Sequence, residues 1–383
     1  MRFFEGIELK RLSWPTLLFA GILLLIGLAF VYSASYRSGP EGEGYYTSSW
    51  QKQLVWAVMG FCLMLAILAV DYKKYLEWAF VIYAAAVVLL LLTMVPSIGV
   101  VINNSRRWID FGPLRLQTSE LMKIGVILAL ARYLPSRENH REFVSLIVPF
   151  AIVLIPVVII ARQPDLGTSL MFLPVLLAMV YVAGARLKHL FIFFLMGLIA
   201  LPCLWFVMKP YQRQRVMSFI QQDTQDEELL MDELYHLTQS KAAIGSGGAF
   251  GMGYGRGSQN RLNFLPMRNT DFIFAVICEE MGFFRATGVL VLYLLFFLSC
   301  AHVADQCKDP PGRLIVVGII ALFATQMLVN TGMSTGQLPT VGLPLPFMSY
   351  GGSSLLMCFT GLALIINVST RPVILWGRER DVD

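Results

Sequence analysis

The sequence is poor in charge, and it lacks the cysteine and histidine clusters that build metal or disulfide sites. Of its 383 residues only 14% are charged, and it has six cysteines and four histidines. No Cys-x-x-Cys pair occurs, so the sequence predicts neither a disulfide framework nor a zinc site. The net charge of +5 is small and scattered, which gives no basis for binding nucleic acid.

Apolar residues make up 56% of the chain, a larger share than in ordinary globular domains. They fall in long runs, which are typical of transmembrane helices. We therefore predict an all-α, polytopic membrane protein with about ten transmembrane helices, in one membrane domain over residues 1–383. The candidate spans are residues 14–33, 53–70, 76–95, 119–134, 143–161, 168–184, 187–208, 272–300, 314–333 and 354–369.

The short basic segments between spans predict the orientation. Residues 71–75 and 135–141, for example, carry lysine or arginine and should be cytoplasmic. An even number of spans then puts both termini in the cytoplasm. The first apolar run has no small-residue cleavage site, so we expect a retained signal anchor. The largest extracytoplasmic loop is residues 209–270, between the seventh and eighth spans.

The predicted outer loops are rich in basic residues, against the usual charge pattern. One interpretation is a solvated surface, because long loops escape the positive-inside rule. The other is a surface for an anionic substrate, because the planar guanidinium of arginine can hold two phosphate oxygens at once. The basic residues are Arg106, Arg107, Arg115, Lys209, Arg213, Arg215, Lys241, Arg256, Arg261 and Arg268.

The large outer loop divides into three parts. Residues 211–220 are typical of a basic amphipathic helix at the membrane interface, and residues 223–233 of an acidic, solvated helix or turn. Residues 245–257 hold seven glycines but match neither the Walker nor the dinucleotide-binding pattern. This last part is either a flexible connector or a set of backbone N–H groups turned toward an anion.

Asp271 stands where the glycine-rich loop gives way to the eighth span. An acid just before an apolar helix often caps its free N–H groups. A carboxylate at a dry boundary facing cationic loops is also suited to act as a general base. Two further acids, Glu279 and Glu280, lie inside the span, where ionisable groups are costly and are functional candidates. Being adjacent, they should point to different faces of the helix, so at most one should face a given cavity.

Three other segments carry polar groups at membrane depth. Glu120 and Lys123 share one helix face at the start of the fourth span, which predicts an ion pair. Residues 163–168, Gln-Pro-Asp-Leu-Gly-Thr, interrupt an apolar run, and Asp165 should cap the sixth span. The last outer loop, residues 336–354, is apolar but rich in proline and glycine. This composition indicates a rigid re-entrant lining, with hydroxyl groups from Ser349, Ser353 and Ser354.

Together these segments resemble the SEDS family of membrane proteins over essentially the whole chain. Within that family they look more like its elongation branch, RodA, than its division branch, FtsW. The matching motifs are Arg107-Trp-Ile, Gln117-x-Ser-Glu120, Gln163-Pro-Asp-Leu-Gly-Thr168, Tyr211-Gln-Arg-Gln-Arg215, Gln239-Ser-Lys-Ala-Ala-Ile-Gly-Ser-Gly-Gly248, Thr270-Asp-Phe-Ile-Phe274 with Glu279-Glu280, and Pro344-Leu-Pro-Phe-Met-Ser-Tyr-Gly-Gly-Ser-Ser354.

The resemblance implies a peptidoglycan glycosyltransferase that polymerises lipid II at the outer face of the bacterial cytoplasmic membrane. It makes Asp271 the catalytic base, and it implies a divalent cation, Mg or Mn, whose ligands the sequence does not identify. The implied substrate-binding residues are Arg107, Glu120, Lys123, Arg213, Arg215, Lys241, Arg256, Arg268, Ser349 and Ser353. The chain departs from the family at Met267 and Asn269, where glutamate and histidine are usual, and at Thr118 and Arg285.

The implied partners are a class B penicillin-binding protein that supplies the transpeptidase, other membrane proteins of the elongation machinery, and membrane lipids. Two alternatives remain at this point. The chain could translocate lipid II across the membrane, for which buried Glu120 and Lys123 would suit a path. It could also be a non-catalytic scaffold of the elongation complex, an alternative that the departures at Met267 and Asn269 keep open.

Overall fold

The computed structural model describes most of the chain, and the described part is mainly helical. It covers residues 8–38, 44–102, 105–110, 112, 115–136, 144–193, 195, 197, 213, 216, 217, 219, 220 and 233–371. Arg215 lies outside these residues, as do half of the predicted interfacial helix at 211–220 and the acidic stretch up to residue 232. The predictions made for those segments therefore stay predictions.

Five described helices are long and apolar enough to cross a membrane, which agrees with a multi-pass protein. In a bilayer every backbone polar group must find a partner inside the chain, and an apolar helix achieves this alone. The five are α1 (Trp14–Ala34), α2 (Ser49–Ala69), α14 (Ile273–Gln306), α15 (Pro310–Ser334) and α16 (Gly352–Thr370). Each of them overlaps a predicted span.

The other predicted spans are shorter or divided. The third is split at Trp78 and the sixth at Met171, while most of the seventh lies outside the described residues. The shorter helices are η1 (Leu9–Arg11), α3 (Tyr72–Glu77), α4 (Ala79–Leu92), α5 (Thr118–Tyr133), η2 (Leu134–Ser136), η3 (Val144–Leu146), α6 (Ile147–Arg162), α7 (Leu166–Leu170), α8 (Phe172–Val182), α12 (Glu233–Ser246) and α13 (Ser258–Arg261).

The all-α prediction is wrong in one respect, because five short strands decorate the bundle. Strand β1 (Tyr36–Ser38) pairs with β2 (Gly44–Tyr46), and β3 (Gly99–Ile102), β4 (Ser105–Asp110) and β5 (Arg115–Gln117) form an antiparallel sheet. These strands lie outside the apolar runs, where hydropathy carries no signal. Alternating patterns of three to six residues are too short to identify from sequence.

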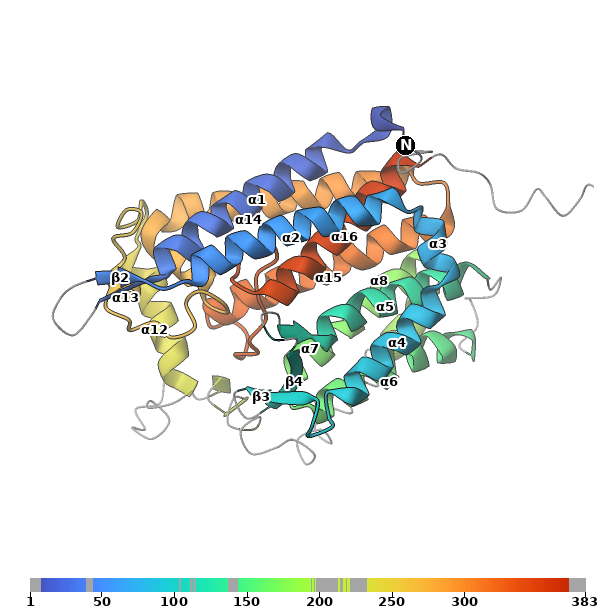
Figure 1. The fold of residues 1–383 in the computed structure, drawn as a ribbon, viewed down its shortest axis with the longest axis horizontal. Helices are drawn as coiled ribbons and strands as arrows, with labels where there is room; N and C mark the ends of the chain where they lie inside the picture. Colours follow the sequence, from blue (N-terminus) through green and yellow to red (C-terminus); the bar gives the residue numbers. More distant parts are fainter. Residues whose placement is uncertain are drawn as a thin grey trace, which may run out of the picture.

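The bundle has two distinct ends. The described chain ends meet at one of them, where the backbone N–H of Glu8 donates to the carbonyl of Thr370 at 2.8 Å. We call this end the terminal face; α3 lies there too (Figure 1). The opposite end, the loop face, carries the strands, α12 and α13 (Figure 1). The two described chain ends therefore share one side, as an even number of spans requires.

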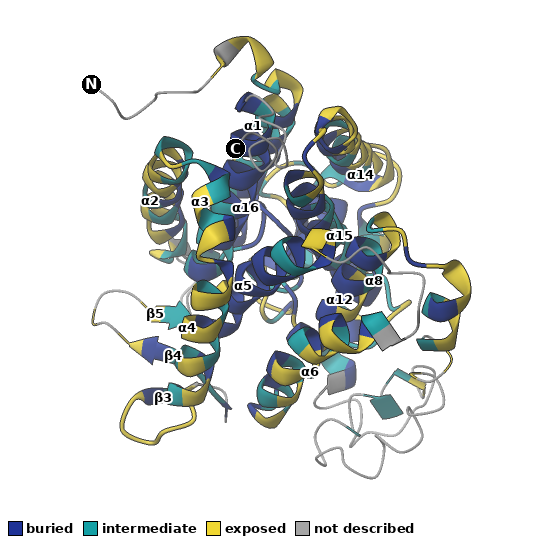
Figure 2. Ribbon diagram, turned by 90° about the vertical axis from the view of Figure 1, so that its right-hand side faces the viewer, coloured by how far each residue is buried: buried dark blue, intermediate teal, exposed yellow. Residues whose placement is uncertain are grey.

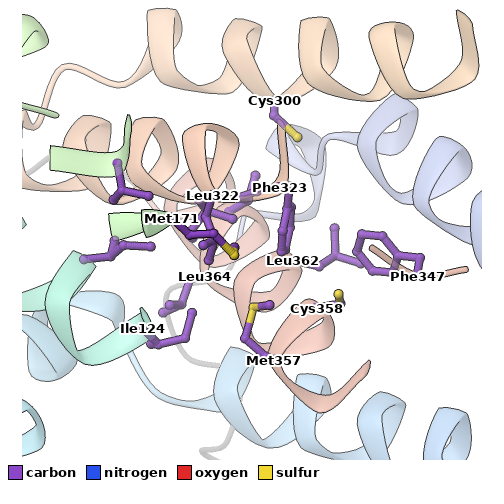
Figure 3. Close-up of a cluster of buried hydrophobic side chains, with 14 of the residues drawn as sticks. Ile124, Met171, Cys300, Leu322, Phe323, Phe347, Met357, Cys358, Leu362 and Leu364 are labelled. Carbon is purple, nitrogen blue, oxygen red and sulfur yellow. The ribbon is translucent and has the colours of Figure 1, made fainter. Parts of the chain in front are cut away.

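The core lies where α5, α15 and α16 pack together. These helices are buried around most of their surface, whereas α2 and α14 expose apolar side chains on their outer sides (Figure 2). Figure 3 shows part of this core, with Phe323 of α15 beside Met357, Cys358 and Leu362 of α16. An apolar outer surface over an apolar core is the pattern of a helical bundle in lipid.

Residues 336–351 form the predicted re-entrant segment. The ring of Phe347 is 2% exposed and packs edge-on against Phe296 of α14 and Phe323 of α15, with centroids 5.7 and 5.6 Å apart. The hydroxyl of Tyr293 donates to the Pro346 carbonyl at 2.5 Å. This loop is therefore part of the core, and it gives the loop face a rigid floor.

Candidate active site

Asp271 lies on the loop face, two residues before α14 begins. Phe272 occupies the N-cap position, and Asp271 is half-buried. Its backbone N–H donates to the carbonyl of Met267 at 3.1 Å, in a tight turn where Met267 has a φ of 48°. The Met267 side chain is 53% exposed. At the position where the family usually has glutamate, this chain thus contributes a backbone carbonyl to the turn.

Asn330 of α15 fixes the position of Asp271. This side chain is fully buried, and its Nδ2 donates to the backbone carbonyl of Asp271 at 2.8 Å and to that of Leu343 at 2.7 Å. Its Oδ1 has no hydrogen-bond partner among the described residues. Sequence reasoning missed Asn330, although a polar amide within an apolar span is an available signal.

The re-entrant segment holds the other side of the Asp271 turn. The Ser349 hydroxyl donates to the Thr270 carbonyl at 2.6 Å and accepts from the backbone N–H of Leu345 at 2.8 Å. The backbone N–H of Tyr350 donates to the carbonyl of Asn269 at 2.8 Å. Ser349, predicted to bind substrate, therefore joins two loops in this structure.

Two further contacts complete this support. A Cβ added at Gly342, whose φ is +69°, would lie 3.4 Å from the Oδ2 of Asp271, so the backbone approaches the carboxylate closely here. Gln53 of α2, which sequence reasoning also missed, is 1% exposed and bonds the segment through the Ser349 carbonyl and the Gly351 N–H, at 3.1 and 3.2 Å. Thus α2, α15 and the re-entrant segment together set where the carboxylate stands.

The glycine-rich loop is not a free connector, because it packs against a break in α14 and turns the Gly255 N–H toward the Glu280 carboxylate. Gly282 interrupts the helix with φ 77° and ψ 178°, a conformation open only to glycine. The N–H of Gly253 donates to the Glu280 carbonyl at 3.0 Å, and that of Phe283 donates to the Gly248 carbonyl at 2.9 Å. The loop thus satisfies backbone groups that the broken helix leaves without partners.

The two acids of α14 have largely different hydrogen-bond partners, as expected for adjacent residues that point to different faces of the helix. Glu279 accepts from the backbone N–H of Gln259 at 2.7 Å and of Asn260 at 3.3 Å. Glu280 accepts from Ser33 at 2.5 Å, from the Asn260 amide at 3.0 Å and from the Gly255 N–H at 2.9 Å. The loop wraps around the helix break and supplies donors on both sides. Both carboxylates are therefore structural.

The tip of this loop is tied to α1. Tyr254 donates its hydroxyl to the Ala29 carbonyl at 2.6 Å. Burial raises the pKa of Tyr254 to about 12, so the hydroxyl keeps the proton that it donates. At Gly257 a Cβ would lie 2.5 Å from the Oε2 of Glu279, so only glycine fits beside that carboxylate. These contacts explain why the loop needs glycine without invoking a phosphate.

Arg268, three residues before Asp271, directs its guanidinium at backbone carbonyls. Its side chain is buried, and it donates to Ala34 at 2.9 Å, to Tyr36 at 2.5 Å and to Asn260. Five N–H groups in a fixed fork suit this multiple contact. The structure therefore gives Arg268 the role of joining the end of α1, β1 and α13.

Arg107 of β4 has a comparable role on the other side of the loop face. It donates to the carbonyls of Gln163 (3.1 Å) and Pro164, and its guanidinium lies 3.5 Å from Asp165. Asp165 accepts from the Thr168 N–H at 3.2 Å, which confirms the predicted helix cap. Arg107 therefore holds the Gln-Pro-Asp turn against the sheet.

Glu120 and Lys123 form the predicted ion pair near the start of α5. The Nζ of Lys123 lies 2.6 Å from the Oε1 of Glu120, and both side chains are buried. The second carboxylate oxygen of Glu120 has no hydrogen-bond partner among the described residues, and neither do the hydroxyls of Thr118 and Ser119. Orphaned polar atoms of this kind indicate a place where water or a ligand binds.

The remaining predicted residues are placed as follows. Ser353 donates to the Arg115 carbonyl and accepts from the Gln117 N–H, both at 3.0 Å, and so joins α16 to β5. Arg256 and Lys241 are exposed, in the glycine-rich loop and on α12. Arg213 is half-buried. Of the predicted cations on the loop face, Arg256 and Lys241 are the most accessible described ones.

Few of the described side chains offer oxygen atoms that could bind a divalent cation here. Among the described residues, no group of three or more His, Cys, Asp or Glu side chains could hold a metal ion. Magnesium is often held by one or two carboxylates together with substrate phosphates and water. Asp271 offers a carboxylate, and the Oδ1 of Asn269, two residues away, has no described hydrogen-bond partner. This donor set suits a cation that arrives with a diphosphate.

The chain matches a family model described as a cell cycle protein, named for FtsW, RodA and SpoVE, over residues 14–372. It is 33% identical to "Peptidoglycan glycosyltransferase RodA" of Treponema pallidum, which covers 92% of this chain and 96% of that protein. It is 35% identical to "Probable peptidoglycan glycosyltransferase FtsW" of Geobacter metallireducens, over 95% of this chain and 96% of that protein.

One solved structure extends the comparison to three dimensions. A chain from "Structural coordination of polymerization and crosslinking by a peptidoglycan synthase complex" superposes with a TM-score of 0.78 at 30% identity. The match covers 94% of this chain and 97% of that one. The mainly helical architecture described above is therefore a known fold. Because proteins named RodA and FtsW are similar to a comparable degree, these comparisons do not separate the two branches.

Proposed function

This chain belongs to the FtsW/RodA/SpoVE family, the SEDS peptidoglycan glycosyltransferases, and from that premise we propose that it polymerises lipid II with Asp271 as the general base. We further propose that it does so at the outer face of the bacterial cytoplasmic membrane during cell elongation. The loop face would then be extracytoplasmic, and the terminal face cytoplasmic.

The observation that carries the proposal is the support around Asp271. The acid is half-buried on the loop face, its peptide is bonded by Asn330, and the neighbouring Thr270 carbonyl is bonded by Ser349. Such a carboxylate is reachable from outside and held in one position. These are the two properties that a general base requires.

The proposed reaction transfers a glycan from one lipid-linked diphosphate to the sugar hydroxyl of another. Asp271 accepts the proton of that hydroxyl while its oxygen attacks the anomeric carbon of the donor. The bond from that carbon to the diphosphate breaks, and undecaprenyl pyrophosphate leaves with the bonding electron pair. Attack from the side opposite the leaving group inverts the anomeric centre and gives a β-linked strand.

The diphosphate requires positive charge near Asp271. We propose that Arg256 and Lys241 provide part of it, because both are exposed on the loop face, whereas Arg268 is buried and donates to backbone carbonyls. We also propose that a divalent cation, Mg or Mn, binds with the substrate, next to the Asp271 carboxylate and the Asn269 oxygen. When bound, the cation would stabilise the negative charge of the departing diphosphate.

We propose a class B penicillin-binding protein as the partner, because a polymerised strand must also be crosslinked. A similar chain was solved within a complex whose title names both polymerisation and crosslinking. The alternatives of a lipid II translocator and of a non-catalytic scaffold are less well supported. The relatives are named as glycosyltransferases, and the Glu120–Lys123 pair is closed on itself at 2.6 Å.

The decisive experiment compares Asp271→Asn with Asp305→Asn in a lipid II polymerisation assay with the partner protein. Asp305 is an exposed acid near the other end of α14, so it controls for the loss of one carboxylate. Removing a general base should lower the polymerisation rate at least about 100-fold, with the melting temperature unchanged. The control should match the wild type. Wild-type rates from Asp271→Asn would remove this residue from the mechanism.

Asp271→Asn also tests the cellular role of this chain. In a rod-shaped host depleted of its own elongation enzyme, the wild-type chain should restore rod shape and Asp271→Asn should leave round cells. Rescue only of a division defect, seen as the loss of filaments, would assign the chain to the division branch.

A further inference from the structure

A cavity of about 410 Å³ opens on the terminal face, at the opposite end of the bundle from Asp271. It lies where the start of α1 meets the ends of α14 and α16. Basic residues contribute to its lining, and none of its described lining residues carries a carboxylate. The polar and basic residues of the lining include Lys10, Arg11, Ser13, Ser299, His302 and Arg371.

The hydrogen bonds that these groups already make show which of them can still donate to a ligand. The Ser299 hydroxyl donates to the Phe296 carbonyl at 2.7 Å, and Thr16 donates to Ser299 at 3.0 Å. Since Thr16 uses its proton there, Ser13 donates to Thr16 in their 2.8 Å contact. The protons of these hydroxyls are therefore already used.

Arg371 is also engaged, and it forms a fixed positive floor. It donates to the Asn367 side chain at 3.0 Å and to the Leu68 carbonyl at 3.1 Å, and it lies 3.6 Å from Asp71. Lys10, in contrast, has no ion-pair partner among the described residues. Arg11 pairs with Glu8 at 2.6 Å, but both side chains are about half exposed, so solvent screens the pair.

The start of α1 adds a second, independent observation. Its N-cap, Ser13, makes its side-chain hydrogen bond to the Thr16 hydroxyl and not to a free backbone N–H of the first turn, and that turn contains no acid. A helix N-terminus without either favours an anion. The ends of α14 and α16 reach the same face with the opposite dipole sign, so helix ends alone do not decide the preference. Any preference of this cavity for an anion must therefore come from the basic side chains.

The cavity wall indicates where such an anion comes from. Leu12, Pro15, Val303 and Val368 line it beside the cations. Below it, α1 and α14 are transmembrane helices with exposed apolar side chains. A charged rim over an apolar wall, at the end of transmembrane helices, matches a lipid whose headgroup carries phosphate.

We propose that this cavity binds the phosphate of an anionic phospholipid from the leaflet at the terminal face, with Lys10 and Arg11 as the main contacts. The fixed charge of Arg371 and the start of α1 hold the site in shape, and the acyl chains lie along α1 and α14. The site is separate from the reaction at Asp271, so it can be tested independently of the proposed function.

The test measures lipid binding to the purified full-length chain by native mass spectrometry, with phosphatidylglycerol as the probe. The cavity variant is Lys10→Gln with Arg11→Gln. The matched control is Lys73→Gln with Lys74→Gln in α3, which removes the same charge from the same face without touching the cavity lining. At about fivefold per charge, the cavity variant should bind phosphatidylglycerol about 25-fold more weakly. The control should stay within about threefold of the wild type.

Further arms separate this site from its rivals. Zwitterionic phosphatidylcholine should bind the wild type and the cavity variant equally, and rising salt should reduce their difference for phosphatidylglycerol. Equal loss in both double variants would overturn the proposal in favour of general surface charge. Displacement of the lipid by inorganic phosphate alone would assign the site to a free anion. A wild type without preference for phosphatidylglycerol would also refute it, and unchanged melting temperatures would exclude misfolding as the cause.

Discussion

The two faces of this bundle use their basic side chains in different ways. On the loop face, Arg268 is 6% exposed, and both Arg268 and Arg107 donate to backbone carbonyls. On the terminal face, Lys10 and Arg11 are exposed and line a cavity that has no carboxylate among its described lining residues. From the sequence alone, the loop face was the stronger candidate for an anion-binding surface, because its basic residues depart from the positive-inside charge pattern.

The difference shows what a count of charges can and cannot establish. Net positive charge attracts anions over about a Debye length, whatever the side chains bind locally. A bound anion, however, needs donors that are not already engaged. On the loop face, exposed Arg256 remains as a candidate for substrate contact, whereas Arg268 and Arg107 maintain the architecture around Asp271.

Among the substitutions that test this difference between the two faces, Arg268→Gln is expected to have the largest effect. The substitution leaves carbonyls of α1, β1 and α13 without their charged donor. We expect a loss of about 3–5 kcal/mol in the free energy of unfolding, and with it a loss of folded protein. Thermal unfolding in detergent measures this. Arg11→Gln on the terminal face serves as control and should change stability by less than about 0.5 kcal/mol.

A stable Arg268→Gln variant whose only defect is a higher KM for lipid II would contradict the structural role that we give to Arg268. Arg268 would then contact substrate, as the sequence resemblance first implied.

Asn330→Leu tests the same difference more closely, because Asn330 also donates to backbone, but to the carbonyl of Asp271, the proposed general base. Losing this bond should let Asp271 move, and we expect the polymerisation rate to fall about 10- to 100-fold at saturating substrate. Thr331→Val is the matched control, since the Thr331 hydroxyl bonds only within its own helix. Equal rates for the two variants would mean that the Asn330 bonds do not position the acid.

The smallest effect is expected from Arg256→Gln. An exposed cation that contributes to substrate binding should raise the KM for lipid II about threefold and leave kcat unchanged. Salt should reduce the difference, because the contact is screened. Lys73→Gln on the opposite face should have no effect on KM. A fall in kcat for Arg256→Gln would instead place this side chain at the reacting atoms.

Sequence patterns predicted the local features well. The predicted span at 314–333 lies within α15 (Pro310–Ser334), the Glu120–Lys123 pair forms at 2.6 Å, and Asp165 caps α7. Each of these depends on residues within a few positions of one another. Helical spacing and hydropathy are sufficient for that range.

The remaining features depend on contacts between distant parts of the chain. Arg268 bonds to carbonyls of Ala34 and Tyr36, which are 234 and 232 residues away. The glycine-rich loop looked like a connector because nothing local indicates that it packs against a broken helix. Asn330 was missed because its partners, Asp271 and Leu343, are brought to it only by the fold.

The break at Gly282 also divides α14 mechanically. A continuous helix transmits bending along its length, but no helical hydrogen-bond ladder stiffens the junction at this glycine. Residues 273–281, which follow Asp271, are bonded to the glycine-rich loop, whereas residues 283–306 pack within the membrane bundle. When a partner tilts the transmembrane portion, we expect the reaction centre to keep the frame of the outer loops and to be insulated from that tilt.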